Sequence, residues 1–311
     1  MSLVQDLTPI NLEEEKQKFF DKNCKYNPQF KYKKLITSNM LFRYGKPKPN
    51  YLELAKELLE KAFHNRTEAD IRKIEGEIID LKKAKAMFNE YVIKNNLQKQ
   101  IEMKCSQKFI SKASFISNTF KVRLPIWHRK NEFAGTLNHE IGTHAIRRIN
   151  YVQQPFYKKK VQLGFREYLY TEEGLASLHT LLGRKFKIDY TGALNYLSCQ
   201  KAQELSFSDL FEFVTHYLED QNRAWYYTFR HKRGLYDTNE GGGLTKDLVY
   251  FEGLIKVWLY LKDHSFDLRS LYWGKIAYED INKAKEMNPH FEPLLPYFYT
   301  NNTEKYQQDI T

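Results

Sequence analysis

The sequence predicts an α+β fold that is predominantly α-helical, with one small antiparallel sheet. Apolar residues recur at helical spacing over most of the chain, whereas a stretch from about Ile101 to Leu124 consists of short β-prone runs. Of the 311 residues, 42% are hydrophobic and 15% are aromatic, which is enough to fill a substantial core. We expect residues 1–95 to form an N-terminal helical lobe and residues 96–311 a second domain, or both to form one compact unit.

Two long amphipathic helices are expected first. The segments YLELAKELLEKAF and IRKIEGEIIDLKKAKAMFNEYVI, between Tyr51 and Asn95, carry apolar residues at helical spacing, and Thr67 is a plausible N-cap for the second helix. The β-prone segment KFISKASFISNTFKVRL follows, and Pro125 ends the predicted sheet. From Asn131 to Ile149 the pattern is helical again.

The rest of the chain predicts further helices. After an irregular stretch over 151–170, Thr171 can cap a helix that runs to Leu182. Helical segments are also expected over 193–204, 208–219, 223–231, 246–262 and 278–286, with the loop GGGLTK at 241–246. No run is long and apolar enough to span a membrane, and the first residues lack the pattern of a signal peptide. The sequence therefore predicts a cytoplasmic protein with no membrane partner.

The formal charge of +11 predicts an anionic partner or substrate, because surplus Lys and Arg attract acidic molecules. These charges are scattered through helical patterns, and no zinc finger, RNA-recognition signature or basic arm organises them. We therefore expect no specific binding of nucleic acid. The three cysteines are far apart and form neither a disulfide framework nor a CxxC metal site.

The segment HEIGTH contains His139, Glu140 and His144, which together suggest a metal site. A catalytic zinc needs three protein ligands and one open position, and in thermolysin-like enzymes the ligands are two histidines and a glutamate. The usual helical motif separates its histidines by four residues, but here the separation is five. In a regular helix the second ring would be rotated by about 100° too far. A π-type bulge at Gly142 and Thr143 would restore the alignment.

The segment TEEGLASLH offers two candidates for the third ligand, Glu172 and Glu173. Acidic residues are also favoured in the first turn of a helix by its dipole, so this segment alone does not require a metal. Combined with HEIGTH, it favours one catalytic Zn²⁺ ion. The larger predicted domain is then a gluzincin-like zinc metallopeptidase with its sheet beside the HEIGTH helix.

Peptide hydrolysis at such a centre assigns a role to Glu140. This carboxylate would take a proton from the attacking water and pass it to the leaving amine. A carboxypeptidase also needs a group that holds the terminal carboxylate of its substrate, and a guanidinium can do so through two parallel hydrogen bonds. The candidates in this sequence are Arg147, Arg223, Arg230 and Arg233.

At HEIGTH, NYVQQPF and TEEGLASLH the chain resembles the microtubule-associated tyrosine carboxypeptidases, zinc enzymes that remove the C-terminal tyrosine of α-tubulin. Four further segments look like family segments in the expected order: NCKYNPQFKY, RAWYYTFRHKRGLYDT, LTKDLVYFEG and KIAYEDI. The resemblance covers the chain from about Asn23 onward. Bacterial relatives with a QEGLA-type motif share the catalytic pattern.

The resemblance implies a role for each residue of the centre. The two histidine ligands fall on His139 and His144, the glutamate ligand on Glu173 and the catalytic glutamate on Glu140. It also implies cleavage of a tyrosine or another aromatic residue from an acidic tail, with α-tubulin as the expected partner and a cytoplasmic, cytoskeleton-associated location. The alternatives are a metallopeptidase of the same fold with another peptide substrate, and a non-catalytic binding module.

Overall fold

The computed structural model describes residues 3–310, and the chain divides into two compact units, each built from two segments. The first unit runs from the start of the chain to Ile71 and includes Ile188–Phe251. The second unit comprises Arg72–Lys187 and the segment from Glu252 onward. The predicted lobe of residues 1–95 is therefore shared between the two units.

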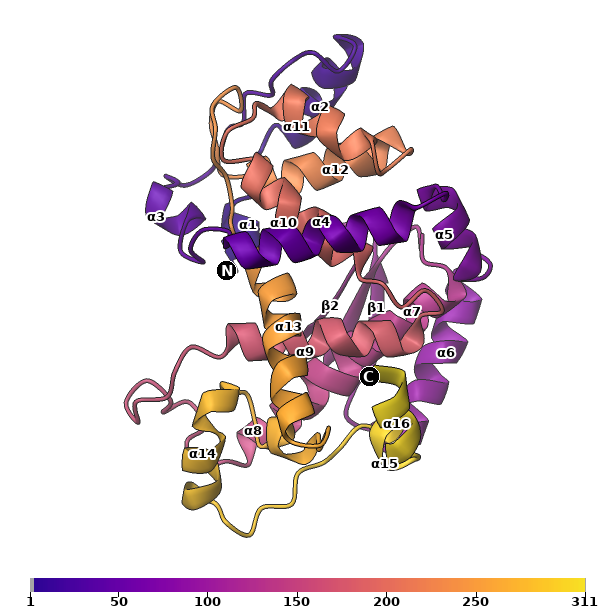
Figure 1. The fold of residues 1–311 in the computed structure, drawn as a ribbon, viewed down its shortest axis with the longest axis vertical. Coiled ribbons are helices and arrows are strands. Elements are labelled where there is room, and N and C mark those ends of the chain that lie inside the picture. Colours follow the sequence, from indigo (N-terminus) through magenta and orange to yellow (C-terminus); the bar gives the residue numbers. More distant parts are fainter. Residues whose placement is uncertain (1–2, 311) are drawn as a thin grey trace. The chain divides into compact units, whose positions relative to one another are not determined.

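The first unit is helical and has an aromatic interior. Its helices are α1 (Leu3–Asp6), α2 (Leu12–Asp21), α3 (Ser38–Leu41), α4 (Pro49–Phe63), α10 (Tyr190–Lys201), α11 (Phe207–Thr215) and α12 (Gln221–Lys232), drawn in Figure 1. Phe19, from α2, packs edge-on against Phe207 and Phe211 of α11. The side chains of Asp189, Ser206 and Asp220 cap α10, α11 and α12 by accepting backbone N–H groups, as N-cap residues do.

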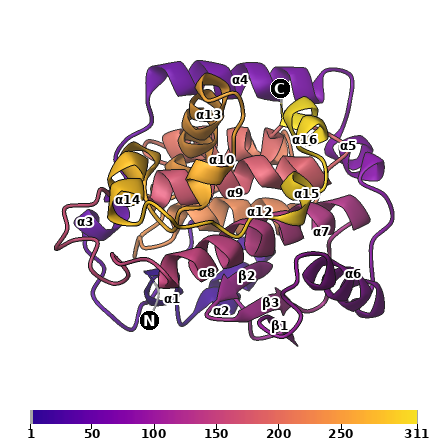
Figure 2. The ribbon, with the colours of Figure 1, turned by 90° about the horizontal axis from the view of Figure 1, so that it is seen from below.

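The second unit contains most of the remaining elements. They are α6 (Leu81–Lys94), α7 (Lys130–Leu137), the π-helix η1 (Asn138–Ala145), α8 (Ile146–Val152), α9 (Leu169–Gly183), the 3₁₀ turns η2 (Arg269–Tyr272) and η3 (Tyr278–Asp280), α14 (Ile281–Met287), α15 (Tyr297–Thr300) and α16 (Thr303–Ile310). Two helices, α5 (Glu68–Ile74) and α13 (Leu248–Asp263), run across the division of the chain. In this unit α9 runs beside α7 and η1 (Figure 2).

The sheet of the second unit is mixed, whereas the sequence predicted an antiparallel one. Its strands β1 (Glu102–Ser106), β2 (Ala113–Ile116) and β3 (Thr119–Arg123) lie in the order β1-β3-β2. The short turn at Ser117 and Asn118 makes β2 and β3 antiparallel, but the longer connection from β1 allows β1 to pair with β3 in parallel. The edge strand β2 lies against η1, so the prediction of a small sheet beside the HEIGTH helix is confirmed.

Two predicted helix boundaries are wrong. The helix expected after Thr67 is interrupted: α5 ends at Ile74, Gly76 has a positive φ of 87°, and α6 starts only after Asp80, which caps it. Thr67 itself does accept the backbone N–H of Asp70.

The helix α9 begins at Leu169, one turn before the predicted start. Thr171 therefore lies inside the helix, where its hydroxyl oxygen accepts the backbone N–H of Tyr278 instead of capping the helix.

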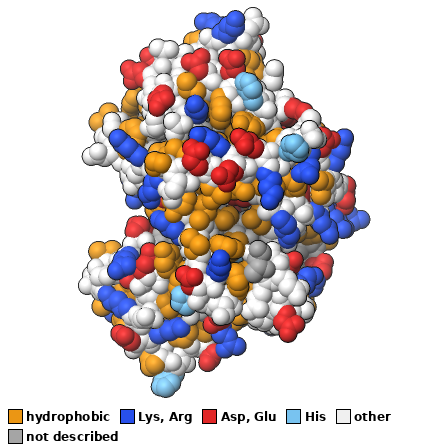
Figure 3. All heavy atoms as spheres, in the orientation of Figure 1, with side chains coloured by type: hydrophobic (Ala, Val, Ile, Leu, Met, Phe, Trp, Pro, Cys, Tyr) orange, Lys and Arg blue, Asp and Glu red, His pale blue; other side chains and the backbone are white. Residues whose placement is uncertain are grey.

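Surface charge is dispersed on the face drawn in Figure 3, where Lys and Arg side chains lie among acidic and apolar ones. This agrees with the scattered charges of the sequence. Among the helices of residues 3–310, none combines the length and apolar character needed to cross a membrane.

Candidate metal centre

The segment that carries HEIGTH is a π-helix, Asn138–Ala145, inserted between α7 and α8. The prediction of a π-type distortion, made from the five-residue spacing of the histidines, is confirmed. Side chains satisfy polar groups of the widened turn: the Tyr272 hydroxyl donates to the carbonyl oxygen of Gly142 at 2.6 Å, and the Thr143 hydroxyl donates to that of Asn138 at 3.0 Å. The distortion is thus held by specific buried hydrogen bonds.

Gly142 is required by its surroundings. A Cβ at this position would lie 2.5 Å from the hydroxyl oxygen of Tyr91 and 2.7 Å from a ring carbon of Phe298. Both distances are shorter than van der Waals contact allows. Only glycine therefore lets α6 and α15 approach the π-helix this closely.

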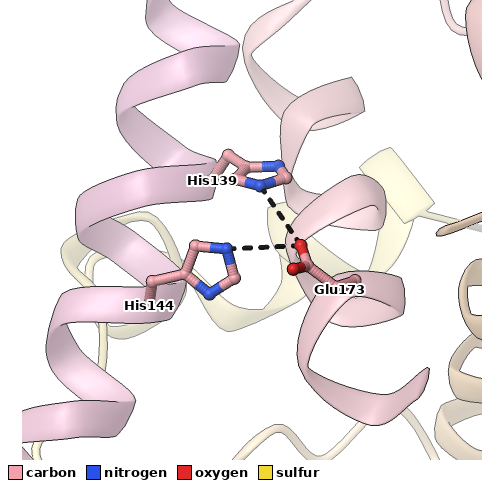
Figure 4. Close-up of side chains that lie close together, drawn as sticks. All are labelled: His139, His144 and Glu173. Atoms are coloured by element: carbon pink, nitrogen blue, oxygen red, sulfur yellow. Dashed lines mark ion pairs between the residues drawn. The ribbon is translucent and has the colours of Figure 1, made fainter. Parts of the chain in front are cut away.

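The π-helix turns both histidine rings toward Glu173 of α9 (Figure 4). The nearest carboxylate oxygen of Glu173 lies 3.9 Å from Nε2 of His139 and 3.5 Å from Nε2 of His144. One ligand atom from each of the three residues lies within 4.8 Å of the others. The three residues that the sequence predicts as metal ligands therefore lie close together, on two helices that run side by side.

Hydrogen bonds orient both imidazoles. The Thr180 hydroxyl donates to the carbonyl oxygen of Ala176, so its oxygen accepts from Nδ1 of His139 at 3.0 Å. Nδ1 of His144 lies 2.7 Å from a carboxylate oxygen of Glu172, which can only accept while it is ionised. When each ring is neutral, this leaves Nε2 as the nitrogen whose lone pair faces Glu173. Such outer partners fix the tautomer of metal-binding histidines.

Glu172 is the hub of a buried charge network. Its carboxylate contacts Nδ1 of His144, pairs with the guanidinium of Arg147 and lies 2.7 Å from the Lys275 ammonium. Glu172 is 3% exposed and Arg147 fully buried. Burial alone would raise the pKa of Glu172, but Lys275 and Arg147 outweigh it and hold the pKa well below its usual value.

The two histidines differ in protonation. Burial and the nearby His144 lower the pKa of His139 to about 4, so this ring is neutral at pH 7. Burial opposes protonation of His144 too, but its hydrogen bonds with Glu172 and Glu173 prevail and raise its pKa to about 10. A cation entering among these residues would have to displace that proton.

Glu140 stands next to His139 on the π-helix and has a raised pKa. Burial is the main cause, while the positive charge of His144 and the backbone N–H of Phe115 on β2 act in the opposite direction. A carboxylate whose pKa is raised toward neutrality is suited to receive and release a proton.

The arrangement fits a tetrahedral metal ion with one open position. Zinc bonds of about 2.0–2.2 Å to nitrogen and oxygen place tetrahedral ligand atoms roughly 3.3–3.5 Å apart. The separation of His144 Nε2 and Glu173 is 3.5 Å, and that of His139 Nε2 and Glu173 is somewhat longer at 3.9 Å. Two imidazoles and a carboxylate are also a donor set that zinc favours.

The four candidate arginines all have partners within the protein. Arg147 is fully buried and donates to Glu172 and to the carbonyl oxygens of Leu271 and Ile276, so it orders the network and is not accessible to a substrate.

In the first unit, Arg223 pairs with Glu68 and Arg230 pairs with Asp247 through several hydrogen bonds. Arg233 donates from Nε to the carbonyl oxygen of Arg230, and burial lowers its pKa to about 10. All three guanidinium groups are thus engaged in contacts within the first unit, although the side chain of Arg230 is still 40% exposed.

Sequence reasoning missed Thr180 and Lys275. Thr180 follows Glu173 by seven positions on α9, which places it on the same helical face, so this signal was available. Lys275 lies on an irregular loop about a hundred residues after Glu172; it is the first residue of the family-like segment KIAYEDI, but the segment by itself gives this lysine no role.

Fold and site together define a helical protein with two histidines on a π-helix and one glutamate on α9 that form a candidate metal centre. The sequence model of the microtubule-associated tyrosine carboxypeptidase family matches residues 38–291, so the chain belongs to this family. Microtubule-associated tyrosine carboxypeptidase 1 of Mus musculus is 29% identical over 314 residues, which cover 98% of this chain. The proteins of the same name from Rattus norvegicus and Homo sapiens are 30% and 29% identical. The chain spans 66% of the length of these three relatives.

Proposed function

We propose that this protein is a zinc-dependent carboxypeptidase with a gluzincin-like centre, which removes a C-terminal tyrosine or another aromatic residue from acidic protein tails. The convergence of His139, His144 and Glu173 around one point, with Glu140 beside them, is the observation that carries the proposal. Membership of a family whose relatives are named tyrosine carboxypeptidases supports the reaction and the released residue.

His139, His144 and Glu173 would hold the ion. Bound zinc lowers the pKa of water toward neutrality and polarises a carbonyl group. The Thr180 hydroxyl and the Glu172 carboxylate keep both imidazoles in the tautomer that presents Nε2.

Glu140 is the general base and acid of this scheme. Its carboxylate takes a proton from the attacking water, and the raised pKa lets it hand the proton to the leaving amine. Burial of the site limits competition from bulk water and strengthens each electrostatic contact.

The proposed substrate is the acidic C-terminal tail of α-tubulin, reached in the cytoplasm at the cytoskeleton. The relatives are named as microtubule-associated, and a formal charge of +11 favours encounter with acidic tails.

Substituting Glu140→Gln tests the reaction, because the amide keeps the size of the side chain but cannot accept the proton. We expect zinc content to be unchanged and kcat to fall by at least about a hundredfold on a peptide ending in Glu-Glu-Tyr, the lower range for a general base. Tyrosine release and bound metal are measured on the same samples. A variant that trims the peptide at the normal rate would exclude Glu140 as the base.

A further inference from the structure

Three basic side chains gather around the Glu172 carboxylate, each from a different part of the second unit. Arg147 comes from α8, Lys275 from the loop between η2 and η3, and Lys160 from the connection between α8 and α9. Arg147 and Lys275 contact the carboxylate directly, while Lys160 is near enough for Glu172 to stabilise its charge.

Positive charge exceeds negative charge around Glu172. One carboxylate faces two cations in contact, and the Lys160 ammonium donates to the carbonyl oxygen of Lys275 at 2.6 Å. The same ammonium lies 3.3 Å from the centre of the Tyr168 ring. Burial, with opposition from Glu172 and help from Arg147, lowers the pKa of Lys160 to about 8. The other carboxylate that affects it, Glu167, is exposed to solvent. A half-buried surplus of this kind stabilises an incoming anion.

This surplus of positive charge lies next to one of the predicted metal ligands, His144. His144 and Lys275 contact the same carboxylate oxygen of Glu172, each at 2.7 Å, so the Lys275 ammonium is two hydrogen bonds away from the imidazole ring. In a carboxypeptidase the bond that is cut and the free carboxylate are separated by one residue, roughly 3.5 Å of extended chain. A group that binds this carboxylate must therefore lie near the centre, within the length of one residue plus its own hydrogen-bond distance.

Accessibility separates the two lysines from the arginine. Arg147 is completely buried and cannot meet a substrate, whereas the side chain of Lys275 is 23% exposed and Lys160 is partly exposed. The proposed chemistry of Glu140 and the three ligands uses neither lysine.

We propose that Lys275 and Lys160 bind the free α-carboxylate of the substrate's C-terminal residue, and so make the enzyme an exopeptidase; this rests on the function proposed above. The two ammonium groups thus have the role that the sequence suggested for an arginine, which is to bind the terminal carboxylate of the substrate. Arg147 and Glu172 act as positioning residues that hold Lys275 in place.

The experiment uses the zinc-loaded Glu140→Gln protein, so that peptides bind without being cut. Three peptides are compared by fluorescence anisotropy: one ending in Glu-Glu-Tyr with a free carboxylate, its C-terminal amide, and one ending in Gln-Gln-Tyr with a free carboxylate. We expect the free acid to bind about tenfold or more tightly than the amide, as a charge-assisted hydrogen bond allows. Adding Lys160→Met or Lys275→Met should reduce this preference to less than about threefold.

Lys283→Met is the matched control. This lysine is also partly exposed, donates to the carbonyl oxygen of Leu163 and lies 4.9 Å from the centre of the Phe165 ring, but it comes from α14 and does not pair with Glu172. Its substitution should leave the preference unchanged. Zinc content is measured for every variant, because Lys275 shares Glu172 with a ligand, while Lys160 does not contact Glu172 directly.

Three results would overturn the inference. If both lysine variants keep the preference for the free acid, the lysines do not bind the carboxylate. If they lose instead the distinction between Glu-Glu-Tyr and Gln-Gln-Tyr, they bind an acidic side chain. If the protein with Glu140 intact neither cuts nor binds any of the peptides, both the proposed function and this carboxylate site are rejected. If it cuts them but the lysine variants keep the preference for the free acid, only the carboxylate site is rejected.

Discussion

At the scale of single residues, the centre depends on carboxylates with different duties. Glu173 faces both histidines, whereas its neighbour Glu172 contacts Nδ1 of His144 and two cations. Adjacent helical residues point about 100° apart, so one can face the site while the other supports it. The sequence indicated that Glu172 or Glu173 could be a ligand. Only the packing of α9 shows which of them faces the histidines and which contacts the supporting cations.

Replacing Glu172 by Gln tests its supporting role. The amide is nearly the same size, but it leaves the buried charge of Arg147 without its partner and weakens the acceptor for His144. We expect zinc affinity to fall about 10- to 100-fold and the free energy of unfolding to fall by about 3–5 kcal/mol.

Chelator competition gives the affinity and urea titration the stability. The exposed Glu167→Gln is the matched control and should change neither. Full zinc affinity in Glu172→Gln would show that His144 does not need this acceptor.

At the scale of elements, the five-residue spacing of the histidines carried the most information. Because a regular helix cannot align two rings five residues apart, the spacing predicts a π-turn, and η1 contains it. The direction of β1 was not predictable in the same way. Side chains alternate between the two faces in the same way in parallel and antiparallel strands. The alternation therefore does not show that β1 pairs with β3 in parallel.

The substitution Gly142→Ala tests the packing of the π-helix. The added methyl group meets Tyr91 and Phe298, so we expect a loss of about 1–3 kcal/mol in unfolding free energy, typical of overpacking, and weaker zinc binding. Adding Phe298→Leu should recover part of the loss, because it removes one of the two obstacles.

Both quantities are measured by urea titration and by competition with a zinc chelator. A Gly142→Ala protein as stable as the parent would mean that α6 or α15 moves aside without cost.

At the scale of the whole molecule, the chain interleaves two units, and this was beyond prediction. The pattern of apolar residues is local, whereas the two segments of the first unit are more than a hundred residues apart in the sequence and those of the second more than sixty. We expected a lobe over residues 1–95 because the predicted helices there are neighbours in the sequence. Such a pattern does not show which distant segments a helix packs against.

Both units bury histidines in the neutral form, which makes the molecule sensitive to acid. Burial lowers the pKa of His128 and His231 to about 4, and that of His179 lies well below 6.5 for the same reason. Between pH 6.5 and 4 the unfolded chain binds these protons and the folded chain does not. The contribution of these three histidines to stability is therefore complete above pH 6.5 and decreases as the pH falls, by about 1.4 kcal/mol per pH unit for each group.

The variant His231→Gln should lose about 2 kcal/mol less than the parent between pH 7 and pH 5, because one such group is removed. Gln can keep the contact with Asn195. Urea titrations at both pH values measure the difference, and the exposed His264→Gln serves as the control. Equal losses in parent and His231→Gln would assign the acid sensitivity to other groups.

The π-turn also couples the histidine spacing to everything that follows it. Removing one residue between His139 and His144 would give the common four-residue spacing on a regular helix. It would also turn α8 by about 100° about its axis. Arg147 and Asn150, which reach carbonyl oxygens of Leu271 and Tyr272, would then point away from their partners. The extra residue therefore cannot be removed without changing the orientation of α8. A single deletion would restore the common histidine spacing but would break the hydrogen bonds of Arg147 and Asn150.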